Sequence, residues 1–101
     1  MSMFGKMKDV YKLQKEAKRI KAKLKKTHIE AEVEGITIII NGEQEVISVT
    51  ISDEAIQNPK KMQENLVKAF NKAIKKSQQV GADEMKEVMG DMGLNLPGMG
   101  G

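Results

Sequence analysis

Hydrophobic residues in the first quarter of the chain recur three and four positions apart, which is the spacing of a coiled-coil seam. Good helix formers dominate this segment, and its only glycine lies near the start. The pattern predicts one helix from Met3 to about Thr27. On that helix, five apolar side chains fall within an arc of about 80°, and we call them the apolar seam. Its members are Val10, Leu13, Ala17, Ile20 and Leu24.

Residues 28–52 change to a period of two, which is typical of strands. Polar and apolar residues alternate from His28 to Glu34, and the β-branched run Ile36–Ile40 strongly favours a strand. Asn41-Gly42 follows, and both residues tolerate the positive φ of a type I′ hairpin turn. The return strand then runs from Glu43 to Ser52. We therefore predict a three-stranded antiparallel meander.

One face of this meander is strongly apolar. Whether the hairpin loop has two or four residues, the parity of the pairing places six β-branched side chains together, and such a face needs a helix over it. Those six residues are Ile36, Ile38, Ile40, Ile47, Val49 and Ile51.

The second half of the chain predicts a short helical turn over Asp53–Ile56 and then a long helix. Asn58-Pro59 marks the start of the long helix, with Asn as its cap and Pro at its first position. Gly81 interrupts the apolar stripe as a kink, a close contact or a break, and we expect the helix to continue to about Gly90. Its apolar positions are Met62, Leu66, Phe70, Ala73, Ile74, Val80, Met85, Val88, Met89 and Met92.

The order of elements is α-β-β-β-α, which predicts an α+β fold with long N- and C-terminal helices. The whole chain, residues 1–101, forms a single domain. It divides into a basic helix over 1–27, an antiparallel sheet over 28–52, a C-terminal helical region over 53–92 and a flexible tail over 93–101.

Charge divides the chain into two opposed blocks. Residues 1–27 carry ten Lys or Arg and two acidic residues, a net charge of +8. Residues 28–101 carry seven basic and twelve acidic residues, a net charge of −5. Such a division indicates an oriented molecule with one end that attracts polyanions.

The basic residues of the first helix also gather on one side of it. Five of them fall within about 60°, away from the apolar seam. Exposed helices usually mix charges to form pairs one turn apart, and only Asp9 and Glu16 could supply such pairs here. We call this set the basic ridge and take it as the candidate DNA-binding surface, with an ordinary solvated face as the alternative. Its members are Lys8, Lys12, Lys15, Arg19 and Lys26.

No catalytic or metal site is expected. His28 is the only histidine, cysteine is absent, and no glycine-rich stretch matches a phosphate-binding motif. Glu30, Glu32 and Glu34 alternate along one strand face, which is more typical of a solvated surface or a partner for lysines than of a metal site. We predict that the protein is not an enzyme and uses no cofactor, metal or small-molecule substrate.

Membrane association is not expected either. No apolar run approaches the roughly 20 residues that cross a bilayer, and the N-terminus lacks the apolar stretch of a signal peptide. The predicted location is the cytoplasm. With only three aromatic residues, the chain is too poor for a base-stacking platform, so binding to a duplex backbone suits it better.

Several motifs together carry a resemblance to a known family. They are Met3-Phe4-Gly5-Lys6, the hairpin Ile38-Ile39-Ile40-Asn41-Gly42, the helical run Leu66-Val67-Lys68-Ala69-Phe70-Asn71-Lys72-Ala73-Ile74, and the ending Met92-Gly93-Leu94-Asn95-Leu96-Pro97-Gly98. Over nearly its whole length the chain resembles the YbaB/EbfC family of small bacterial nucleoid-associated proteins. The resemblance implies an interlocked homodimer whose first helices project like the arms of tweezers and contact DNA. Family members often carry a longer glycine-rich loop between the first two strands, where this chain has only Glu34-Gly35.

The expected function is therefore dimeric DNA binding in the nucleoid, through phosphate contacts from the basic ridge, with an influence on gene expression or nucleoid organisation. Lys outnumbers Arg nine to one in residues 1–27, which favours diffuse charge attraction over base recognition. Two alternatives remain. The apolar seam could dock another helix in a protein-interaction module, or the ridge could bind RNA.

Overall fold

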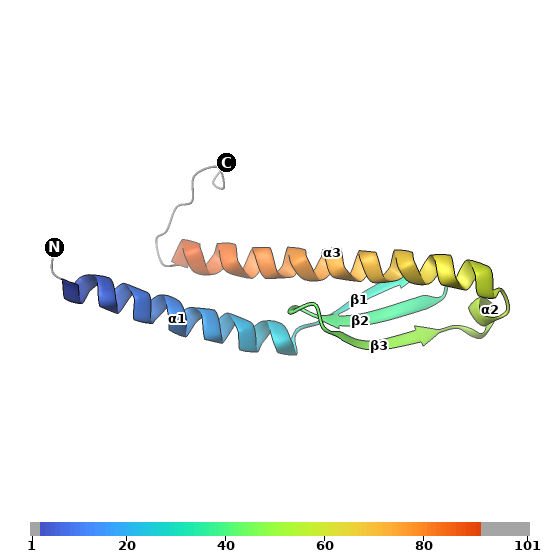
Figure 1. The fold of residues 1–101 in the computed structure, drawn as a ribbon, viewed down its shortest axis with the longest axis horizontal. Coiled ribbons are helices and arrows are strands. Elements are labelled where there is room, and N and C mark those ends of the chain that lie inside the picture. The colour runs from blue at the N-terminus through green and yellow to red at the C-terminus, as the bar shows by residue number, and fades with distance from the viewer. Residues whose placement is uncertain (1–2, 92–101) are drawn as a thin grey trace.

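The computed structural model describes the backbone of residues 3–91 and the side chains of residues 10–90. A long helix leads into a three-stranded sheet, and a second long helix lies along one face of that sheet (Figure 1). This arrangement confirms the predicted α-β-β-β-α fold. The elements are α1 (Met3–Lys26), β1 (His28–Val33), β2 (Ile36–Asn41), β3 (Val46–Ile51), α2 (Asp53–Ile56) and α3 (Pro59–Asp91). The predicted flexible tail, residues 93–101, lies outside the described residues.

The sheet is an antiparallel meander in the order β1-β2-β3. Ile38 pairs with Val49 and Ile36 with Ile51, as the parity of the sequence predicts. The register shifts near the turn, however, so that Ile40 pairs with Val46. A β-bulge between Val46 and Ser48 therefore takes up Ile47, and the pairs beyond the bulge keep the predicted parity.

The turn between β2 and β3 differs from the prediction. Asn41 and Gly42 do not have positive φ, whereas Glu34 and Gly35 do, at 48° and 84°. The two-residue turn of the I′ kind thus joins β1 to β2 instead of β2 to β3.

In the connection between β2 and β3, three residues lie between the hydrogen-bonded pair Asn41 and Glu45. The Asn41 N–H donates to the Glu45 carbonyl (2.9 Å), and Gln44 takes the left-handed conformation with a φ of 64°. An odd loop length alone would shift the faces of β3, and the one-residue bulge restores them.

The core forms where α3 crosses β2. Ile36, Ile38 and Ile40 are fully buried, and Ala69 and Ala73 on α3 are buried against them. Small side chains on the helix let its backbone approach the bulky β-branched face of the strand closely. Ala69 belongs to this core although the predicted apolar stripe omitted it.

β3 is left largely uncovered by this packing. Contacts of α3 reach β1 and β2, while Val46, Ile47 and Val49 of β3 are 42–48% exposed. The reason is geometric, because a helix about 10 Å wide covers about two strands spaced about 4.8 Å apart.

The opposite edge of the sheet is protected by lysines from α3. Lys72 and Lys76 donate through Nζ to the backbone carbonyls of Glu32 (3.1 Å) and Glu30 (2.9 Å) on β1. Lysines along an edge discourage further strands from pairing there. Glu30 and Glu32 thus do have lysine neighbours, but the lysines bind the backbone carbonyls of these residues and not their carboxylates.

α3 continues without a break through Gly81 to Asp91, as expected. Its start is also as predicted, because the Asn58 side chain accepts a hydrogen bond from the Lys61 N–H (3.3 Å). The helix therefore extends well past the sheet, and its second half runs beside α1 (Figure 1).

The turn at Gly35 yields a stability test. We expect Gly35→Ala to lower the free energy of unfolding by about 1–3 kcal/mol, because φ is positive there and the new Cβ would lie 2.4 Å from Ser52 Oγ. Gly90→Ala, where a Cβ meets nothing within 4 Å, is the matched control and should leave stability unchanged or slightly higher. Urea unfolding followed by circular dichroism measures both. Equal stability of the two variants would contradict this account of the turn.

Candidate nucleic-acid interface

Among residues 10–26 of α1, the C-terminal part is covered by other described elements and the rest is largely exposed. Ile20 is 5% exposed and Leu24 is half-buried, where α1 contacts α3 and β2. Val10 and Leu13 are 54% and 44% exposed, and Ala17 is exposed too. Within the described chain, only the last two residues of the apolar seam, Ile20 and Leu24, are therefore covered.

The basic ridge lies on the surface of this helix. All of its members with described side chains are exposed, and the side chain of Lys8 lies outside the described residues. Because the covered seam residues face the body, the ridge is turned away from it, and helix geometry keeps its members along one line. The structure thus brings four of the five predicted residues together on one open face: Lys12, Lys15, Arg19 and Lys26.

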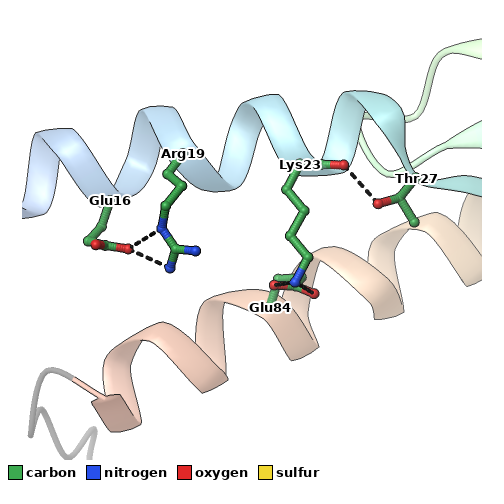
Figure 2. Close-up of polar contacts among 5 residues, drawn as sticks. All are labelled: Glu16, Arg19, Lys23, Thr27 and Glu84. Atoms are coloured by element: carbon green, nitrogen blue, oxygen red, sulfur yellow. Dashed lines mark hydrogen bonds and ion pairs between the residues drawn. The ribbon is translucent and has the colours of Figure 1, made fainter.

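One ridge residue is engaged by a carboxylate. Arg19 pairs with Glu16, at 2.7 Å from Nη2 and 2.8 Å from Nε to the same oxygen (Figure 2). Lys12, Lys15 and Lys26 form no ion pair with another described residue. Arg19 is 60% exposed and Glu16 is 32% exposed, and surface pairs of this kind contribute at most about 1 kcal/mol. A phosphate can therefore compete for this guanidinium, and the ridge keeps most of its charge.

A second ion pair connects α1 to α3 and was not foreseen from the sequence. Lys23 Nζ lies 2.9 Å from Oε1 and 3.1 Å from Oε2 of Glu84, and Figure 2 shows the lysine reaching across from one helix to the other. The two residues are 61 positions apart, so no local spacing indicates their pairing. This contact turns Lys23 toward α3 and adds a partly exposed ion pair to the contacts between the two helices.

The base of α1 is held by the loop between β2 and β3. The Gly42 N–H donates to the Leu24 carbonyl (2.8 Å), and Asn41 Nδ2 donates to the Lys25 carbonyl (3.3 Å). Three lysines in the last turn, Lys23, Lys25 and Lys26, complement the negative end of the helix. The position of the ridge thus depends on residues far from it in the sequence.

The described residues offer no metal site and no membrane-spanning helix. They contain no group of three or more His, Asp or Glu side chains arranged to hold a metal ion, and His28 is exposed at the start of β1. None of the helices in this part of the chain is long and apolar enough to span a bilayer.

Comparison with known proteins bears on this arrangement of an exposed basic helix beside a helix-covered sheet. The sequence profile of the YbaB/EbfC DNA-binding family matches residues 1–92. The chain belongs to this family. The family is one of nucleoid-associated DNA-binding proteins and not one of enzymes.

Individual relatives agree with the profile. A nucleoid-associated protein of Syntrophobacter fumaroxidans is 33% identical over 100 residues, covering 95% of this chain and 89% of the relative. Another of Desulforamulus reducens is 34% identical over 97 residues, covering 92% and 90%. A crystal structure of an uncharacterized Helicobacter pylori protein matches with a TM-score of 0.74 at 20% identity, covering 91% of this YbaB/EbfC chain and 97% of that one. This last likeness concerns the fold alone.

The ion pair between Lys23 and Glu84 is testable by a double-mutant cycle with Lys23→Gln and Glu84→Gln. We expect a coupling free energy below about 1 kcal/mol at low salt and less at high salt, because the lysine is half-exposed. Thermal unfolding of the four proteins measures it. Lys86→Gln is the control for removing an exposed lysine. A coupling that does not weaken with salt would mean that the contact is not an exposed ion pair.

Proposed function

We propose that this protein is a homodimer that binds duplex DNA in the bacterial nucleoid, within the cytoplasm, mainly through phosphate contacts from the basic ridge of α1. The observation that carries the proposal is the exposed ridge, in which Lys12, Lys15 and Lys26 form no ion pair with another described residue. Membership in a DNA-binding family supports the choice of DNA as the polyanion. An influence on gene expression or nucleoid organisation would follow from such binding.

The chemistry of the ridge favours phosphate over base contacts. Lysine ammonium groups are compact point charges, whereas base recognition in the major groove typically uses the planar fork of arginine. Arg19 is the only arginine of the chain, and it already binds Glu16. If about five phosphates are neutralised per chain, the log–log salt slope of affinity for a dimer is on the order of −9. Low sequence specificity is the corresponding expectation.

The uncovered strand supports a second copy as the partner. Val49 lies on the face of the sheet that α3 covers over β2, since it pairs with the fully buried Ile38. α3 covers about two strands, so a helix from another chain fits over β3. We infer that α3 of a partner subunit fills this place, which would interlock the two chains and hold two copies of α1 at a fixed separation.

The ridge is tested by the triple variant Lys12→Glu, Lys15→Glu and Arg19→Glu. We expect affinity for duplexes of any sequence to fall on the order of 100-fold at low salt, and the salt slope to shrink by about 5 for six lost contacts per dimer. Fluorescence anisotropy at several salt concentrations measures both quantities.

The matched control reverses three exposed lysines in the first half of α3, Lys60, Lys61 and Lys68. Its net charge equals that of the ridge variant, so a general charge effect would weaken both proteins alike. If the ridge itself binds DNA, the ridge variant loses affinity and the control variant does not. Equal affinities for the two variants would remove the ridge from the proposal.

The dimer is tested with Val49→Glu, which places a carboxylate on the α3-facing side of β3. We expect this variant to be monomeric by size-exclusion chromatography with light scattering, because burying an unpaired charge costs more than the interface can supply. Thr50→Glu is the control, since Thr50 pairs with Thr37 on the other face of the sheet, and it should remain dimeric. A monomeric unaltered protein, or a dimeric Val49→Glu, would contradict the interface.

A protein-interaction module is the second candidate, and the exposure of Val10 and Leu13 favours it. In that case the apolar seam docks a helix of another protein. The same light-scattering measurement discriminates: a stable dimer supports DNA binding, whereas a monomer that forms larger oligomers supports the module. Competition by structured RNA in the anisotropy assay tests RNA as the alternative ligand.

A further inference from the structure

We propose that the loop residues Asn41 and Gly42, together with Ser77 of α3, form a polar joint that fixes the direction of α1 and so positions the basic ridge. The effect of this joint on DNA binding rests on the proposed function, whereas its effect on the direction of α1 does not.

The joint uses the carbonyl groups at the end of α1. The last carbonyls of a helix have no partner within the helix and ordinarily bind water or a capping group. Here the Gly42 N–H donates to the carbonyls of Leu24 (2.8 Å) and Thr27 (3.2 Å), and Asn41 Nδ2 donates to that of Lys25 (3.3 Å). The loop between two strands therefore caps the helix, which fixes the end of α1 to the sheet.

The side chain of Asn41 is itself held from both ends. Its Oδ1 accepts from the N–H groups of Glu43 (2.9 Å) and Glu45 (3.0 Å), and its Nδ2 also donates to Glu45 Oε1 (2.9 Å). Only 2% of the residue is exposed. An amide with every group engaged in a buried site cannot rotate without leaving polar atoms unpaired, which costs about 1–3 kcal/mol each. The direction of its bond to α1 is thus fixed.

Ser77 connects the loop to α3. Its side chain is fully buried, and Oγ donates to the Asn41 carbonyl at 2.8 Å. A polar residue inside the apolar stripe of a helix would ordinarily weaken the core, and here its hydroxyl has one partner, on the loop. Hydrogen bonds thus lead from Ser77 on α3 to Asn41 and from Asn41 to the Lys25 carbonyl at the end of α1. They join α3, the end of β2 and α1 at one place.

Gly42 is required by close approach and not by its φ. A Cβ built on it would lie 2.7 and 2.9 Å from side-chain atoms of Leu24 and 3.0 Å from the Leu24 Cα. Backbone and side chain of α1 therefore pack directly on the loop. Gly81 of α3 lies across the same loop, yet its Cβ would make only an ordinary contact, 3.9 Å from the Gly42 carbonyl oxygen. Replacing either glycine by alanine adds the same methyl group, but only at Gly42 does that group clash with α1.

The direction of α1 matters because the free part of the helix is long. Residues 10–19 lie outside the body with exposed or half-buried side chains, so a small rotation at the base displaces the ridge by several ångströms. In a dimer, the second ridge binds DNA as an intramolecular step whose effective concentration depends on the separation of the two sites. A loosened joint leaves every lysine in place and lowers affinity through geometry alone.

The test compares Gly42→Ala with Gly81→Ala. The chain has no cysteine, so Gln14→Cys and Gln63→Cys provide two exposed sites for spin labels, one on α1 and one on α3. Labelled chains are diluted with unlabelled chains, so that pulsed electron paramagnetic resonance measures the distance between the two labels of one chain. We expect Gly42→Ala to shift or broaden the distance distribution and to lower affinity for long duplexes on the order of tenfold. Gly81→Ala should change neither.

Each result has a distinct meaning. An unchanged distance in Gly42→Ala overturns the joint, and a changed distance with unchanged affinity overturns its role in binding. If the unaltered protein binds no DNA, the proposed function fails while the distances still judge the joint. Should Gly42→Ala fail to fold by circular dichroism, Ser77→Ala replaces it, since it removes only the hydroxyl; an unchanged distance there overturns the joint as well.

Discussion

The packing of α3 on β2 is the contact on which the rest of this structure depends. Three isoleucines of the strand are fully buried, and alanines of the helix let the two backbones approach closely. Because α3 is 33 residues long, it also extends past the sheet and offers a surface for the base of α1. One helix thus organises the core and holds the basic helix beside it.

The same packing leaves two apolar surfaces open, the exposed side of β3 and the free part of the apolar seam. Within the described part of the chain neither surface is covered, since α3 packs on β1 and β2. Charge is also divided along the chain, with the positive block on α1 and the negative block in the remainder. An acidic body repels a polyanion, which supports the proposal that DNA approaches along the free part of α1.

Sequence reasoning was accurate for features set by neighbouring residues. The ends of α1 and α3, the three strands and the isoleucine face were predictable from their periods of 3.6 and 2, because one-sided burial imposes those periods. It was wrong for the type I′ turn at Asn41-Gly42. Asn41-Gly42 tolerates positive φ, yet this loop also caps α1, and the hydrogen bonds of Asn41 to Glu43 and Glu45 require a wider turn. Asn41-Gly42 is a local hairpin signal in the sequence, but in the fold these residues make tertiary contacts with the end of α1.

The sequence by itself determined the order of elements, the apolar faces and the concentration of positive charge on one helix side, since these follow from local spacing and residue type. Only the tertiary structure decided which seam residues are covered, that Lys23 binds Glu84, and that Ser77 and Asn41 hold the end of α1. Those contacts join residues 16 to 61 positions apart. Their partners are selected by how the helices and the sheet pack in three dimensions, which no periodicity along the chain records.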